Sequence, residues 1–117
     1  MIRALSDRRY QGILLGTNDT VYLAIAGAGT GTQLNIAAWA GPSGPADFDI
    51  YARCGSLPTP TVWQARSNHG GNEEFLTISN AQCGPASVLY VAVNSFNGSG
   101  GFNIMASRMN TTANKSL

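Results

Sequence analysis

Residues 46–59, with the sequence ADFDIYARCGSLPT, decide the fold of this chain. Phe48, Ile50 and Ala52 alternate with polar or aromatic residues, which is the period of a β-strand with one buried face. The Gly-Ser-Leu-Pro segment that follows is typical of a turn and ends the strand. The stretch therefore predicts one face of a β-sheet packed on a core.

The same pattern continues on both sides of this strand, and no window of ten residues has helical periodicity. Turn-forming residues recur every 8–14 residues. The Asn-Gly-Ser-Gly-Gly segment at 97–101 indicates a β-hairpin between its flanking runs. We predict an all-β fold, an antiparallel β-sandwich of jelly-roll type with about eight strands. The expected strands are residues 8–15, 20–25, 33–39, 48–53, 62–66, 74–79, 88–96 and 102–109.

The stretch 46–59 resembles the D-x-D-L-Y-x-x-x-G-x-x-P-T signature of the bacterial pre-peptidase C-terminal (PPC) domain, with Ile50 where Leu is usual and Cys54 inside the signature. Other pieces follow in the order of that family and extend the resemblance over residues 8 to 106. They are the Val-Tyr-Leu run at 21–23 with the strand at 33–39, Asn-Glu-Glu-Phe at 72–75, Leu-Tyr-Val-Ala-Val at 89–93, and Gly-Ser-Gly-Gly-Phe-Asn-Ile at 98–104.

The resemblance implies a jelly-roll β-sandwich that is extracellular and non-catalytic. Domains of this kind accompany secreted proteases and other hydrolases, and related collagen-binding modules bind substrate and calcium. Fold likeness alone does not carry the function across.

The chain of 117 residues has the size of one domain. We expect a single domain over residues 1–117, with a core at about 8–109 and terminal segments at 1–7 and 110–117. Only 11% of the residues are charged and the net charge is +1, which argues against nucleic-acid binding. Apolar runs of five or six residues also argue against membrane insertion.

The two cysteines, Cys54 and Cys83, predict one structural disulfide in a secreted protein. Two buried free thiols, or half of a metal site, are the alternatives. No signal peptide is visible in the chain shown, so an exported chain would be the mature form or an excised piece.

The acidic residues form two small clusters. Asp47 and Asp49 lie two residues apart on one strand, so their side chains share a face at about 6.5–7 Å, and Glu73 and Glu74 precede another strand. Hard oxygen ligands of this kind suit calcium. The alternatives are structural hydrogen bonding by the aspartates, or paired carboxylates for glycoside hydrolysis. Calcium is the only cofactor that these residues indicate.

We predict no catalytic residues. His69 is the only histidine and lies in a turn-like segment, where a general base would still need a nucleophile and an orienting group. Trp39 and Tyr51 face away from the aliphatic side of their strands, so they are the candidates for an exposed contact face. The alternative is that aromatic residues fill the core or pair across strands.

These observations favour a non-catalytic secreted protein that acts by protein–protein contact. The first hypothesis is a structural subunit that self-associates into an extracellular filament or surface layer by edge or terminal-strand pairing, or that adheres to another extracellular protein. Ends such as 1–7 and 110–117 are usually disordered unless something holds them, and nothing in a lone monomer would be expected to do so. The second hypothesis is an ancillary module of a secreted hydrolase that binds a protein or polysaccharide substrate.

Overall fold

The computed structural model describes residues 2–4, 9–14, 16–25, 33–41, 47–67, 73–79 and 88–109. These residues contain nine strands and no helix, so no described helix is long and apolar enough to span a membrane. The strands are β1 (Ile2–Ala4), β2 (Arg9–Leu14), β3 (Thr20–Ile25), β4 (Gln33–Ala40), β5 (Asp47–Cys54), β6 (Ala65–Ser67), β7 (Glu73–Ser79), β8 (Leu89–Asn97) and β9 (Gly100–Met109).

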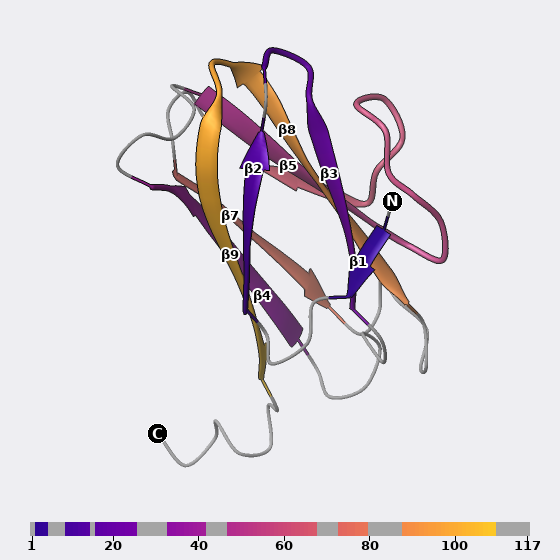
Figure 1. Cartoon of the computed structure of the whole chain (residues 1–117). Helices are drawn as coiled ribbons and strands as arrows, with labels where there is room; N and C mark the ends of the chain where they lie inside the picture. Colours follow the sequence, from indigo (N-terminus) through magenta and orange to yellow (C-terminus); the bar gives the residue numbers. More distant parts are fainter. Residues whose placement is uncertain are drawn as a thin grey trace.

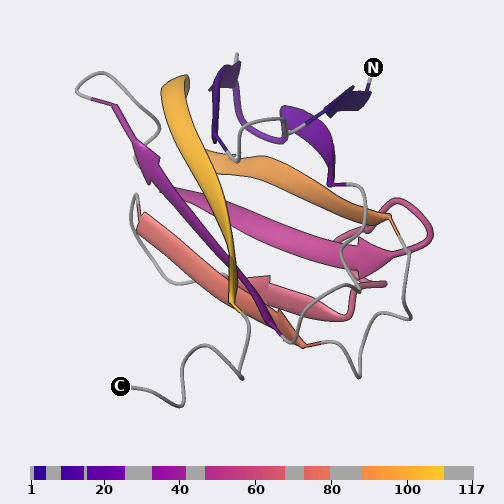
Figure 2. The ribbon, with the colours of Figure 1, turned by 90° about the horizontal axis from the view of Figure 1, so that it is seen from below.

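The strands form two sheets that face each other (Figures 1 and 2). One sheet has the order β1-β3-β8-β5-β6 and the other the order β2-β9-β4-β7. All neighbouring strands are antiparallel except β1, which pairs with β3 in parallel. The predicted all-β sandwich is therefore confirmed.

Apolar residues alternate with more exposed residues along the strands, and the apolar ones form the core between the two sheets. In β4, Leu34, Ile36 and Ala38 are buried while the residues between them are half-buried on the outer face. The Phe102 ring lies 6.5 Å from the Phe48 ring, centroid to centroid, and joins the two sheets across the core. The largest fully buried side chains are Leu14, Leu23, Ile36, Phe48, Ile50, Ile78, Leu89, Val91, Val93, Phe102 and Ile104.

Each of the eight predicted strands has a counterpart, and the strand at 62–66 differs most from its predicted bounds. The strand expected at 62–66 begins only at Ala65. Thr59 and Val62 exchange backbone hydrogen bonds, so Val62 belongs to a turn, and the first backbone hydrogen bond to β5 comes from the Gln64 N–H to the Ala52 carbonyl oxygen.

The hairpin predicted at 97–101 is wrong. The strands that flank this turn, β8 and β9, belong to different sheets. Gly98 and Gly100 have φ angles of 96° and 131°, which glycine adopts at low cost, and the turn carries the chain from one layer to the other. Local turn residues indicated a reversal, but they did not specify in which layer the next strand would pair.

β1 was not predicted. Its three residues pair with Tyr22, Leu23 and Ala24 of the same chain, so part of the segment 1–7 is held within the molecule. The expectation that nothing in a lone monomer would hold this segment is wrong for Ile2–Ala4. Three residues carry too little periodicity to reveal a strand whose partner is distant in sequence. The segment 110–117 lies outside the described residues.

Candidate functional site

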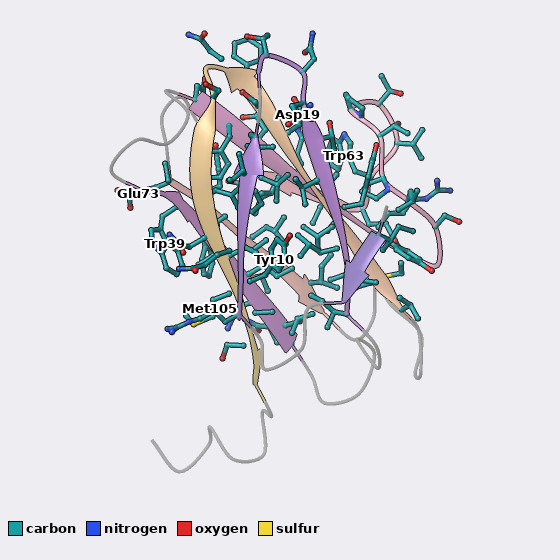
Figure 3. The ribbon with its side chains drawn as sticks, viewed as in Figure 1. Tyr10, Asp19, Trp39, Trp63, Glu73 and Met105 are labelled. Atoms are coloured by element: carbon teal, nitrogen blue, oxygen red, sulfur yellow. The ribbon has the colours of Figure 1, made fainter. Side chains whose placement is uncertain are left out.

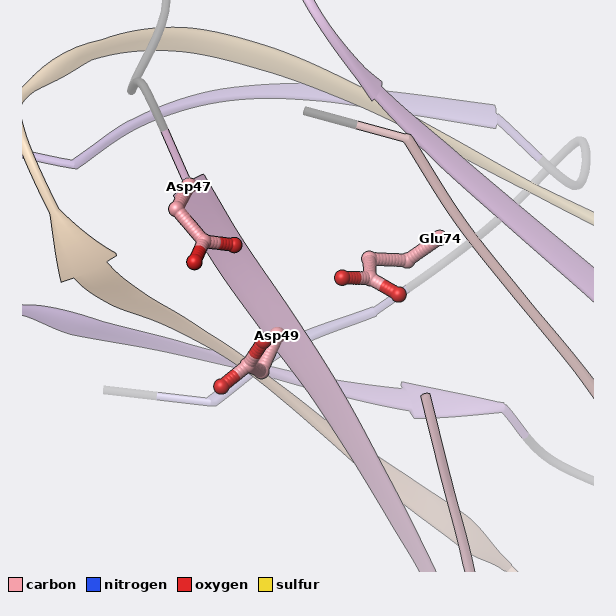
Figure 4. Close-up of side chains that lie close together, drawn as sticks. All are labelled: Asp47, Asp49 and Glu74. Carbon is pink, nitrogen blue, oxygen red and sulfur yellow. The ribbon is translucent and has the colours of Figure 1, made fainter. Parts of the chain in front are cut away.

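Three carboxylates meet beside the edge of the sandwich at which β6 and β7 lie. Asp47 and Asp49 project from β5, and Glu74 reaches toward them from β7 (Figure 4). One ligand atom from each residue lies within 4.8 Å of the others. The shared side of Asp47 and Asp49 follows from their spacing of two along β5, as the sequence predicted. The fold supplies Glu74 from the other sheet.

A buried hydrogen bond fixes the Glu74 carboxylate. The Ser67 hydroxyl of β6 donates to Glu74 Oε2, and both residues are buried. The backbone N–H of Phe75 donates to the same hydroxyl oxygen at 3.2 Å. Ser67 thus orients a carboxylate that would otherwise have several rotamers.

The three carboxylates bring negative charge together at a site where Asp49 and Glu74 are buried from solvent. The Asp49 side chain is only 7% exposed. Burial, followed by the charges of Asp47 and Glu74, raises the pKa of Asp49 to about 6, and the Arg66 guanidinium partly offsets this rise. The pKa of the neighbouring Tyr51 is also raised, first by burial and then by the charge on Asp49. A bound cation would relieve this repulsion.

The donor set fits a hard cation. Calcium takes carboxylate and carbonyl oxygens in an adaptable geometry, and three carboxylates from two strands offer such oxygens. The described part of the chain contains no histidine or cysteine in this group, so its chemistry does not match a zinc site.

Glu73, the fourth residue predicted to bind the metal, lies apart from this cluster. Consecutive residues of a strand face opposite sides, so Glu73 is exposed on the outer face while Glu74 is buried. Glu73 pairs in register with Trp39 of β4. The structure therefore brings together three of the four predicted ligands.

A hollow with a volume of about 340 Å³ lies over β4 and β7, and it is lined by Ala37, Ala38, Trp39, Glu73, Glu74 and Phe75. Ala37 forms its floor, because it pairs with Phe75 of β7 on one side and Met105 of β9 on the other. Phe75 is 58% exposed, and Met105 is also exposed. Trp39, Glu73 and Met105 lie along the same outer side of the four-stranded sheet (Figure 3). The large side chains of Trp39 and Phe75 form apolar walls of the hollow.

Trp39 and Tyr51, the two aromatic residues predicted to be exposed, differ in how much of each side chain is accessible to solvent. Trp39 is half-buried on the outer face and borders the hollow. Tyr51 is only 8% exposed, so its expected exposure is wrong: β8 and β6 pair with it on both sides, through Ala92 and Arg66. Trp63, by contrast, is exposed in the turn before β6, and the Arg66 guanidinium lies 4.7 Å from its ring centroid.

Two of the other predicted residues, Cys83 and His69, lie outside the described residues. Cys54 ends β5 and is half-buried, whereas Cys83 lies outside the described residues, so their pairing stays a prediction.

Ala37 and Phe75 of the hollow, the neighbouring Met105, and Ser67 beside the cluster were not predicted from the sequence. The alternation in residues 73–79 does place Phe75 on the outer side, opposite Leu76 and Ile78. No local signal indicates that Phe75 pairs with Ala37.

Comparison with known proteins identifies the fold. No family model matches the sequence, and no curated protein matches it. Among solved structures, the pre-peptidase C-terminal domain of a collagenase from Bacillus anthracis superimposes with a TM-score of 0.65 at 13% identity, covering 92% of this chain and 95% of that domain.

Two further structures are similar. CorA, a surface-associated copper-binding protein of Methylomicrobium album BG8, gives a TM-score of 0.63 at 4% identity and covers 93% of this chain and 98% of its own. The Yersinia pseudotuberculosis-derived mitogen gives 0.55 at 11% identity, with 86% and 84% covered. The resemblance to the PPC domain that the sequence motifs predicted is confirmed at the level of the fold.

Proposed function

We propose that this chain is a secreted, non-catalytic module that binds an extracellular polymer through the outer face of its four-stranded sheet. Its fold is that of a PPC domain found in a collagenase, and another protein of similar fold is surface-associated. These likenesses support an extracellular, ancillary role.

One observation carries the proposal: Trp39 and the exposed Phe75 line the hollow over Ala37, and Met105, which pairs with Ala37 on β9, is also exposed. Side chains of this size gain free energy when a partner removes them from water, at roughly 25 cal/mol per Å². Exposed apolar side chains gathered beside a hollow, rather than scattered singly, favour an interaction site.

Retention on insoluble polymers tests the proposal. The purified chain is incubated with insoluble collagen, cellulose and chitin, and the bound fraction is measured. We expect retention on at least one polymer that falls several-fold in Trp39→Ala and Phe75→Ala. Phe96→Ala is the matched control, since Phe96 is an exposed aromatic residue on β8 of the other sheet. Unchanged retention in both variants, or no retention on any polymer, contradicts the proposal.

We also propose calcium as the ligand of Asp47, Asp49 and Glu74, as the sequence predicted for these residues. The support is the closeness of the three carboxylates and the raised pKa of Asp49. A bound ion would tie β5 to β7 and so hold the edge of the sheet that carries the hollow.

Two finer features of the predicted fold belong to the same proposal. Jelly-roll connectivity is supported by the pairing of β2 with β9 and of β3 with β8, which joins early strands to late ones. A disulfide between Cys54 and Cys83 would close a loop of about 30 residues and stabilise the fold by roughly 3–4 kcal/mol.

Filament assembly by edge pairing is the second candidate, and one observation favours it. β2 is an edge strand of six residues whose Ile13 is 61% exposed. Open edges with apolar side chains are templates for another strand. Size-exclusion chromatography and negative-stain microscopy test this candidate. Assemblies that dissociate in Ile13→Lys would support it, and a wild-type chain that is monomeric at every concentration would contradict it.

A further inference from the structure

A row of four side chains crosses the outer face of the four-stranded sheet at one level. Gln11 of β2 pairs with Asn103 of β9, Asn103 with Trp39 of β4, and Trp39 with Glu73 of β7. Residues paired in register lie on the same face of a sheet. With strands about 4.8 Å apart, the row is roughly 14 Å long and runs across the strands.

The polar groups of this row are directed to the outside. Gln11 and Glu73 are exposed, and Asn103 is half-buried. Within the described residues, none of the three side chains has a hydrogen-bond or ion-pair partner. Asn35 on the same face differs, because its Oδ1 accepts hydrogen bonds from Gln33 Nε2 and from Thr77 Oγ1. The row therefore keeps two amides and a carboxylate available for a ligand.

The hollow lies directly beside the row. Ala37 is two residues before Trp39 on β4, so both side chains are on the outer face, and the small Ala37 leaves space between Trp39 and Phe75. A volume of about 340 Å³ is at the lower end of small-molecule sites. It is large enough for one ring of a longer ligand.

The chemistry of the row matches a sugar. A pyranose has an apolar C–H face, which stacks on an aromatic ring, and an edge of hydroxyl groups, which bind amides and carboxylates. The charge of this face favours a neutral sugar over a cationic peptide. Glu73 is the only charged group in the row, and Arg9, paired with Met105 at the opposite edge strand, balances it on this face. A nearly neutral face favours a neutral ligand.

We propose that the row Gln11, Asn103, Trp39 and Glu73 binds a neutral polysaccharide chain that runs across the strands. One pyranose stacks on Trp39 above Ala37, and its neighbours donate and accept hydrogen bonds with Asn103, Gln11 and Glu73. This assignment rests on the proposed binding function and names the ligand class.

Calorimetric titration with cellohexaose, chitohexaose and maltoheptaose tests the assignment. We expect at least one oligosaccharide to bind, with affinity about tenfold weaker in Trp39→Ala and several-fold weaker in Asn103→Ala. Trp39→Phe should recover most of the affinity because it keeps a ring, and Phe96→Ala should bind as the wild type does. Thermal unfolding of each variant confirms that it is folded.

Two results would overturn the assignment. One is that no oligosaccharide binds, and the other is that Trp39→Ala binds with wild-type affinity. If either result is found but retention on collagen still depends on Trp39 and Phe75, the chain binds through this face and only the assignment of a polysaccharide ligand is wrong. If retention on every polymer is also independent of both residues, the proposed function fails with it.

Discussion

Ser67 on β6 donates a hydrogen bond to the carboxylate of Glu74 on β7, and both side chains are buried. This bond links the edge strands of the two sheets, because β6 belongs to the five-stranded sheet and β7 to the four-stranded one. The same β7 segment contributes Glu74 to the carboxylate cluster and Phe75 to the outer hollow. Because Glu74 also lines the hollow, the cluster and the hollow adjoin each other at β7.

Removal of the Ser67 hydroxyl should weaken this edge. In Ser67→Ala, the Glu74 carboxylate and the Phe75 N–H each lose a hydrogen-bond partner. We expect the free energy of unfolding to fall by about 1–3 kcal/mol. Chemical denaturation measures this loss, and Ser99→Ala in the exposed turn before β9 is the control. Equal stability of the two variants would contradict the role given to Ser67.

The raised pKa of Asp49 predicts a pH-dependent stability. The folded state holds the Asp49 proton up to about pH 6, whereas the ordinary value is 3.8, so between these values the folded state binds more protons than the unfolded one. Without calcium, stability should therefore fall as the pH rises from 4 to 6 and then level off. Asp49→Asn should remove this fall and be more stable at pH 7 by about 1–2 kcal/mol, after allowance for solvent screening.

Denaturation curves at pH 4, 5, 6 and 7 in a chelator check the prediction. Asp19→Asn is the control, since Asp19 lies outside the cluster. If the free energy of unfolding of Asp49→Asn falls between pH 4 and 6 as steeply as that of the wild type, another group is responsible for the pH dependence.

Calcium should stabilise the chain at neutral pH. At a free concentration ten times the dissociation constant, binding to the folded state alone adds about 1.4 kcal/mol. Asp49→Asn and Glu74→Gln should lose most of this increment, because each removes a carboxylate from the cluster. Glu73→Gln should keep it, because Glu73 lies on the outer face. Thermal unfolding with calcium and with chelator measures the effect, and an equal response in Glu73→Gln and Glu74→Gln would refute the proposed ligand set.

Gly12 is required by close packing between β2 and β9. A Cβ atom at this position would lie 2.7 Å from the ring of Phe102, which is buried in the core. We expect Gly12→Ala to lower the free energy of unfolding by about 1–3 kcal/mol, because the Phe102 ring has little room to move. Gly16→Ala is the matched control, since a Cβ there meets no atom within 4 Å. If both variants unfold at the same denaturant concentration, the packing at Gly12 is looser than described.

The sequence predicted the strands because local alternation specifies them. Residues 20–25 were predicted with the observed bounds, and Asp47 and Asp49 were placed together because their spacing alone determines their common side. The signature at 46–59 also led to the fold that the comparison with the collagenase domain confirms.

Pairing between distant strands could not be predicted in this way. The choice between Glu73 and Glu74 as a ligand depends on which side of β7 faces β5, and the hollow depends on the register of Ala37 with Phe75. The burial of Tyr51 depends on neighbours on both sides of β5, and β1 depends on a parallel partner about twenty residues away. These features arise from tertiary contacts, for which short sequence patterns carry no information.

We propose that the chain binds its ligand through the outer face of the four-stranded sheet. Backbone amide chemical shifts, recorded while a soluble fragment of the retained polymer is added, test it most directly. We predict that the largest changes occur at Ala37, Phe75 and Asn103. Changes confined to Tyr22, Tyr90 and Ala92, on the five-stranded sheet, would contradict the account.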